Sequence, residues 1–119
     1  MGFVPEKSRS YEMFEELRLG LDKIKGEEGI VGYILRDAKS ASIDIKDPSK
    51  IIDYAVLSST ALESGESVSE VFGLGDVSSV VVEGKDAKVL LMSVGSSRLS
   101  IFMRRGVDHE KICKDLHLK

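Results

Sequence analysis

The chain has few of the residues that cross-link small proteins or bind metals: its 119 residues include one cysteine, two histidines, two prolines and no tryptophan. Cys113 therefore has no partner for a disulfide within the chain. A structural zinc site normally takes four Cys or His ligands, so we expect neither a metal nor any other cofactor. A chain of this length can bury roughly 65% of its unfolded surface and needs no such cross-link to fold.

Long apolar runs and strong charge imbalance are also absent. No stretch approaches the roughly 18 consecutive apolar residues of a membrane-spanning helix, so we expect no membrane insertion. The net charge is −3, from 17 basic and 20 acidic residues, and no basic cluster predicts nucleic-acid binding. The first residues, from Met1 to Pro5, show neither the basic region nor the apolar run of a secretion signal. These absences favour a cytoplasmic protein.

Motifs for catalysis or nucleotide binding are missing as well. The glycines in the stretch 73–76 follow a predicted helix and enter a predicted strand, whereas a phosphate-binding loop leaves a strand and opens a helix. Cys113 and the paired serines have no histidine and carboxylate at a recognisable spacing to activate them. We therefore expect a protein that is not an enzyme, with no catalytic, metal or cofactor-binding residues.

The centre of the predicted fold is a three-stranded meander, Val77–Glu83, Lys88–Val94 and Arg98–Arg104. The connections at 84–86 and 95–97 are rich in glycine and serine and are short enough only for antiparallel neighbours. The second strand carries apolar residues of both parities, so both faces of the sheet are expected to be covered. Helices should therefore pack on both sides.

Amphipathic patterns and capping residues predict those helices. In chain order we expect a flexible start at residues 1–9 and then one domain over 10–119, with a helix over Ser10–Lys25, a hairpin from Ile30–Leu35 and Ser40–Lys46, a helix over Asp47–Phe72, the meander, and a helix over Asp108–Leu118. The order helix, two strands, helix, three strands, helix defines an α+β protein.

Two stretches, Glu28–Asp37 and Leu74–Gly95, resemble the roadblock / dynein light chain family. The resemblance implies a five-stranded antiparallel sheet, with profilin-like layering: the middle helix on one face and the terminal helices on the other. It also implies a homodimer, with middle helices side by side and the first meander strands paired. Members of the family bind Ras-like small GTPases or serve as light chains of larger assemblies. The first hairpin departs from the pattern, since the turn Asp37–Ser40 lacks the family's frequent Asp-Gly.

The residues themselves give separate support for a homodimer. The stretch Val77–Val82 carries no lysine, proline or acidic residue, so as a sheet edge it would be open to another strand. The opposite edge is protected by Asp44 and Lys46, and small residues in the middle of the Asp47–Phe72 helix would allow a close approach. The expected interface residues are Ala55, Ser58, Ser59, Leu62, Val77, Ser79 and Val81. The alternative is an edge covered by a loop of the same chain.

These observations predict a non-enzymatic homodimeric regulator or scaffold that binds a Ras-like small GTPase. Acidic residues at helical spacing are expected to be a solvated helix face rather than a site of acid chemistry, and they form a possible polar rim of the partner surface: Glu63, Glu66 and Glu70. A small-ligand sensor and a light-chain-type structural subunit are the alternatives. The identity of the GTPase, and whether an arginine assists its hydrolysis, are left open; the candidates are Arg36, Arg98, Arg104 and Arg105.

Overall fold

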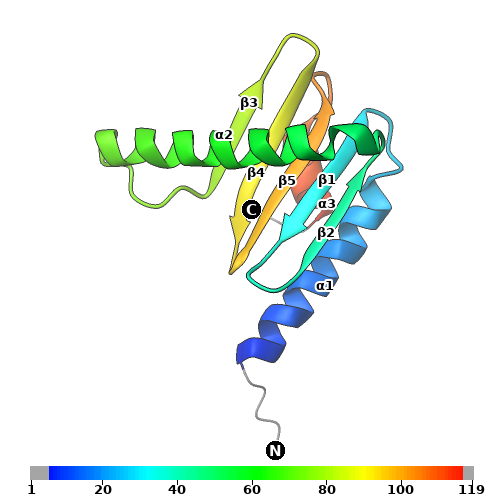
Figure 1. The fold of residues 1–119 in the computed structure, drawn as a ribbon, viewed down its shortest axis with the longest axis horizontal. Helices are drawn as coiled ribbons and strands as arrows, with labels where there is room; N and C mark the ends of the chain where they lie inside the picture. Colours follow the sequence, from blue (N-terminus) through cyan, green and yellow to red (C-terminus); the bar gives the residue numbers. More distant parts are fainter. Residues whose placement is uncertain (1–5, 117–119) are drawn as a thin grey trace, which may run out of the picture.

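A computed structural model describes the backbone of residues 6–116 and the side chains of residues 13–116. One antiparallel five-stranded sheet has the order β2-β1-β5-β4-β3 (Figure 1). The elements confirm the predicted α+β class and the predicted helix and strand order: α1 (Glu6–Ile24), β1 (Ile30–Arg36), β2 (Ala41–Ile45), the 3₁₀ turn η1 (Pro48–Lys50), α2 (Ile51–Phe72), β3 (Ser79–Glu83), β4 (Ala87–Val94), β5 (Ser97–Arg104) and α3 (His109–Asp115).

Each face of the sheet has its own core, as the apolar residues of both parities predicted. On one face α1 and α3 pack on side chains such as Leu35, Ile101 and Met103, which are at most 1% exposed. On the other face α2 crosses the strands and packs on the smaller cluster that includes Val89 and Phe102. Among the described helices, α2 is thus the one that covers this face, whereas α1 and α3 share the other.

The ends of α2 follow from its capping residues. The Asp47 side chain accepts a hydrogen bond from the Ser49 amide at 3.1 Å, and η1 leads directly into the helix. At the other end Gly73 adopts φ 64°, a left-handed conformation that glycine reaches without a Cβ clash. The predicted end at Phe72 is confirmed, whereas the predicted start at Asp47 caps η1, and α2 itself begins at Ile51. Among the described residues no helix is long and apolar enough to cross a membrane.

The terminal helices differ slightly from the sequence prediction. The first helix already begins at Glu6, within the stretch expected to be a flexible start, whereas the sequence pattern placed its beginning at Ser10. The last helix is capped by Asp108, whose carboxylate accepts from the Glu110 amide at 3.0 Å. Its predicted end at Leu118 lies outside the described residues.

The first hairpin closes without a glycine because a side chain holds its turn. One carboxylate oxygen of Asp37 accepts hydrogen bonds from the Lys39 amide at 2.8 Å and the Ser40 amide at 2.7 Å. Aspartate is suited to such a turn because its short side chain reaches the backbone two residues on. The resulting register pairs Arg36 with Ala41.

A polar network holds α1 against the β1–β2 edge. The Tyr33 hydroxyl, on a side chain only 2% exposed, donates to Asp22 Oδ1 at 2.9 Å and lies 3.3 Å from Ser42 Oγ. Lys25 Nζ donates to Asp44 Oδ2 at 2.6 Å. Burial, together with the neighbouring Asp22 carboxylate, raises the pKa of Tyr33, so this phenol stays protonated in the folded chain.

Candidate protein-protein interface

The longest helix crosses the edge strand β3 at a glycine and continues beyond it (Figure 1). A Cβ atom built on Gly65 would lie 2.5 Å from Cγ2 of Val80. Real Cβ contacts are longer than this, so the close crossing depends on the missing side chain. Small residues in the middle of this helix were expected to allow a close approach between subunits. Gly65 instead allows a close approach of α2 to β3 of the same chain.

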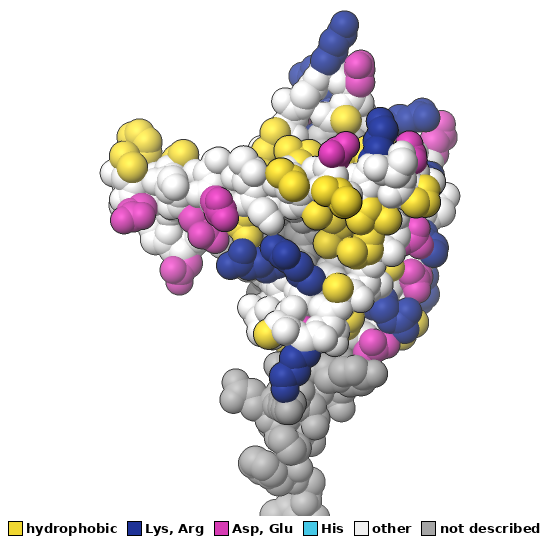
Figure 2. Space-filling model, in the orientation of Figure 1, with side chains coloured by type: hydrophobic (Ala, Val, Ile, Leu, Met, Phe, Trp, Pro, Cys, Tyr) yellow, Lys and Arg dark blue, Asp and Glu magenta, His cyan; other side chains and the backbone are white. Residues whose placement is uncertain are grey.

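After this crossing, several apolar side chains of α2 are exposed to solvent in the single chain. The exposed fractions are 53% for Val68, 78% for Val71 and 72% for Phe72, and Leu74 just beyond the helix is 69% exposed. Figure 2 shows apolar side chains gathered at this free end of the helix. An exposed apolar cluster of this kind is typical of a surface that another protein covers.

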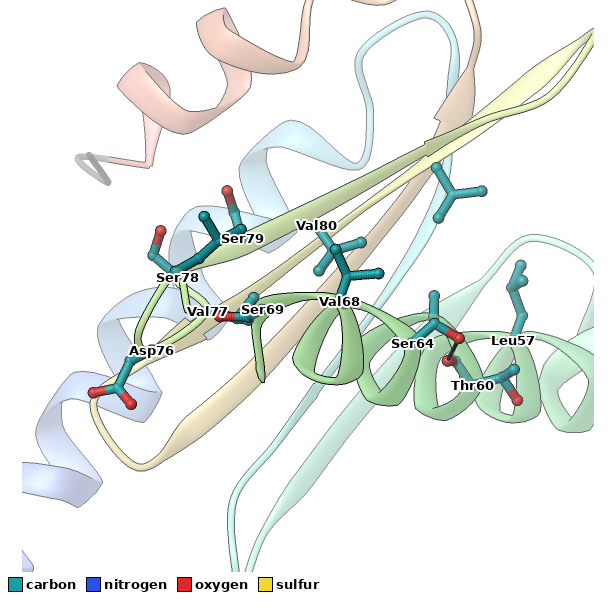
Figure 3. A pocket seen from close by; sticks show the side chains of 14 residues that line it. Leu57, Thr60, Ser64, Val68, Ser69, Asp76, Val77, Ser78, Ser79 and Val80 are labelled. Carbon is teal, nitrogen blue, oxygen red and sulfur yellow. Dashed lines mark hydrogen bonds between the residues drawn. The ribbon is translucent and has the colours of Figure 1, made fainter. Parts of the chain in front are cut away.

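An open groove of about 670 Å³ runs between α2 and β3. One wall is the α2 flank, where side chains recur three or four residues apart, and the other is β3 with the loop before it (Figure 3). The Ser64 hydroxyl donates to the Thr60 carbonyl at 2.8 Å, so this wall satisfies its own polar group. The residues that line the groove include Leu57, Thr60, Ala61, Ser64, Gly65, Val68, Val77, Ser79, Val80 and Val82.

The groove adjoins the outer edge of the sheet at β3. In the described part of the chain, β3 pairs only with β4, and its outer edge pairs with no other strand. Four of its five residues are exposed, including Val81 at 38% and Val82 at 40%. The opposite edge strand β2 carries Asp44 in its ion pair with Lys25. The two edges thus differ: β2 carries a charge within the strand, whereas the charge on β3 is confined to Glu83 at its end.

The expected interface residues fall in three different places. Val77 and Ser79 line the groove, and Val81 is exposed on β3. Ser58 and Leu62, however, are 8% and 6% exposed beneath α2, against the chain's own sheet. Ala55 and Ser59 lie on the flank of α2 away from the groove; Ser59 Oγ is 3.5 Å from an Arg36 guanidinium nitrogen.

Sequence reasoning missed most of the α2 wall of the groove. Leu57, Ala61, Ser64 and Val68 share one flank because they recur at intervals of four, three and four residues. This periodicity is visible in the sequence, and the helix was expected to present a wide apolar face. The sequence did not show which half of that face meets the chain's own sheet.

The acidic residues of α2 lie on the other flank. Glu63, Glu66 and Glu70 are all exposed and continue the helical line that starts at Ser59, again at intervals of four, three and four. They are therefore separate from the groove. The structure brings no partner group to them within salt-bridge distance in the described residues.

Residues with catalytic or metal-binding potential do not assemble in the described residues. No group of three or more His, Cys, Asp or Glu side chains there could hold a metal ion. The Cys113 thiol contacts Met92, with 3.8 Å between the two sulfur atoms. Burial, reinforced by Glu110, raises the pKa of this thiol, which opposes the thiolate that a nucleophile would need. What the described residues do offer is surfaces suited to binding.

The chain has the fold of a Roadblock/LC7 domain. Solved structures with this architecture include a Roadblock/LC7 domain from Streptomyces avermitilis, with a TM-score of 0.65 and 19% identity over 89% of this chain and 87% of that one. No family model matches the chain, and no curated protein matches it by sequence. At such low identity the likeness is one of fold.

Two further structures are of MglB proteins. Myxococcus xanthus MglB has a TM-score of 0.67 and 12% identity, covering 98% of this chain and 86% of its own. The gliding protein MglB from Thermus thermophilus has a TM-score of 0.65 and 14% identity, covering 87% of this chain and 82% of its own. The chain thus shares its fold with these two proteins over most of its length.

Proposed function

We propose that this chain is a non-enzymatic homodimeric regulator or scaffold that binds a Ras-like small GTPase. The observation that supports the dimer is the joint occurrence of an unprotected β3 edge, an apolar groove beside it, and a helix whose apolar end projects past both. An unrelated partner could cover any one of these features. Together they have the form of a self-complementary surface, which is what a two-fold interface requires.

In the proposed dimer the two β3 strands pair antiparallel and make one continuous sheet. The projecting end of each α2 then lies over the partner's β3, and the two helices run side by side in the grooves. Such packing would take Val68, Val71 and Phe72 out of water at about 25 cal/mol per Å² of apolar surface. Strand pairing adds main-chain hydrogen bonds to this apolar contact.

The GTPase part of the proposal is supported by the family resemblance and by the shared Roadblock/LC7 fold. A dimer through β3 would place two α2 helices on one face of a ten-stranded sheet, since each chain contributes five strands. The flanks left outside the groove carry exposed Ile52 and Val56 together with the acidic residues of α2. This mixture of apolar and charged side chains is typical of a protein-binding surface.

Two measurements test the proposal in sequence. Light scattering and sedimentation at micromolar concentration should give twice the chain mass, and a monomer would contradict the dimer. Small GTPases from the source organism, loaded with GDP or a GTP analogue, are then presented to the immobilised chain. Binding in one nucleotide state supports the proposal, and absence of binding in both states opposes it. Hydrolysis measured with and without the chain tells a regulator from a scaffold.

A further inference from the structure

Two arginines stand directly opposite each other on neighbouring strands. Arg36 ends β1 and Arg98 lies near the start of β5, and the two are register partners in the antiparallel pair. The inward neighbours Ile34 and Ser100 lie on the α2 side of the sheet, and the alternation of side chains puts both arginines on that side as well. Both are exposed, and Figure 2 shows basic side chains gathered next to α2 on this face.

The carboxylate next to this pair is Asp37, which lines the same open hollow as both arginines. In the described residues neither guanidinium makes an ion pair, although the chain as a whole is acidic. The adjacent Asp37 carboxylate uses one oxygen to accept two amides of its own turn. Like charges directly opposite each other destabilise a sheet, so the fold tolerates an unfavourable arrangement here.

Serine hydroxyls lie near the two arginines. Arg36 reaches Ser59 Oγ of α2 at 3.5 Å, and Ser58 and Ser100 border the same small hollow between helix and sheet. A wider, open hollow of about 240 Å³ lies next to it at the hairpin turn, bounded by both arginines and by Asp37. Hydroxyl and guanidinium groups on an open ledge suit a carboxylate that arrives from outside.

We propose that Arg36 and Arg98 form a docking point for an acidic segment of a protein partner. An extended or helical segment fits better than a small enclosed anion, because the ledge is open and the enclosed hollow holds only about 30 Å³. The acidic line of α2 also sets the orientation of the segment. Glu63 is four residues from Ser59, or about 6 Å along the helix, so the segment places its acidic part on the arginines and its neutral or basic part beyond.

This docking point is distinct from the proposed dimer interface. It lies on the flank of α2 opposite the groove, and none of its residues lines that groove. A probe peptide can therefore test it whether or not a GTPase partner exists. Failure of GTPase binding would leave this inference standing, and failure of the probe would leave the dimer standing.

The test titrates the full chain with a hexaglutamate peptide at low salt, with hexaglutamine as the uncharged control. The arginine Nε–H resonances of Arg36 and Arg98 should shift with saturation for hexaglutamate alone. The dissociation constant should rise at least fivefold in Arg36→Gln and in Arg98→Gln. Binding of the peptide by the parent chain should weaken as salt is added. Arg105→Gln, on an exposed turn, is the matched control and should bind as the parent chain does.

Three results would overturn the proposal. One is equal binding of hexaglutamate by the parent chain and both glutamine variants. Another is binding of inorganic phosphate as tight as that of the peptide, which would indicate a small-anion site. The last is salt-sensitive self-association that both variants abolish, which would make a second copy the occupant. The melting temperature of each variant supplies a further check: it should stay equal or rise, and a clear fall in both would assign the arginines a structural role.

Discussion

A Cβ atom on Gly65 would approach Cγ2 of Val80 to 2.5 Å, so the crossing of α2 over β3 requires a residue without a side chain. We expect Gly65→Ala to lower the free energy of unfolding by about 1 kcal/mol, because overpacking of about 1–3 kcal/mol exceeds the gain of about 1 kcal/mol in helix propensity. Chemical denaturation followed by circular dichroism measures this change.

A double substitution provides the control for this prediction. Shortening the facing side chain in Gly65→Ala/Val80→Ala should remove the clash, so the two effects should not add. A coupling energy near zero in the double-mutant cycle would show that the contact does not limit the crossing.

Val81→Lys should convert the proposed dimer to monomer. Val81 is 38% exposed on the edge strand, and a lysine there would both charge the edge and oppose its own copy across the two-fold axis. We expect the dimer dissociation constant to rise at least a hundredfold with little change in the circular dichroism spectrum. Sedimentation velocity over a concentration series gives the constant; an unchanged value would exclude β3 from the interface.

Val68→Asp tests the groove separately from the strand edge. Val68 is 53% exposed in the single chain, so the substitution should change monomer stability by less than about 0.5 kcal/mol. It should nevertheless weaken the dimer, because an unpaired carboxylate would be buried between the subunits. Ile52 is 76% exposed near the other end of α2, so Ile52→Asp is the matched control and should leave the dimer intact.

Tyr33→Phe should destabilise the chain by about 1 kcal/mol, because it removes the hydroxyl that links α1 to the β1–β2 edge. Tyr54→Phe is the control: the Tyr54 ring stacks on Phe102 at 4.5 Å, and its hydroxyl makes no hydrogen bond to the described residues. Thermal unfolding of both variants at neutral pH compares them, and equal losses would argue against the network.

The same tyrosine predicts a pH dependence at the alkaline end. Because the pKa of Tyr33 is raised in the folded chain, the unfolded chain loses this proton first. The contribution to stability is complete below the unfolded pKa of about 10 and falls as the pH rises through the folded value. The parent chain should therefore lose stability above pH 10 faster than Tyr33→Phe, as unfolding curves at several pH values would show.

The sequence predicted the fold well because its local signals agreed with one another. Asp47 caps the 3₁₀ turn that leads into α2, and Gly73 ends the helix as capping chemistry indicates; strand parity correctly indicated helices on both faces. The N-terminal boundary was less accurate. The start of α1 at Glu6 shows that a charged, weakly amphipathic stretch can continue a helix that the apolar pattern alone does not reveal.

The candidate interface was only partly predictable, since it depends on how α2 sits across the sheet. Ser58 is buried because its hydroxyl donates to the Tyr54 carbonyl at 2.8 Å, so a serine can face the core here without an unsatisfied group. Val68 and Phe72, by contrast, are of residue types usually found in the core, yet both are exposed to solvent. Residue type alone could not separate these two environments.

The last two turns of α2 contact little of their own chain apart from the loop that follows, where the Ser69 hydroxyl donates to the Gly75 carbonyl. A helix end with so little internal support opens easily, and its amide protons should exchange with solvent faster than those over the sheet. Whatever molecule covers this end supplies the missing support. The protection of these eight or so amides from exchange should therefore rise with the fraction of chains whose helix end is covered, and so with the concentration of the covering molecule.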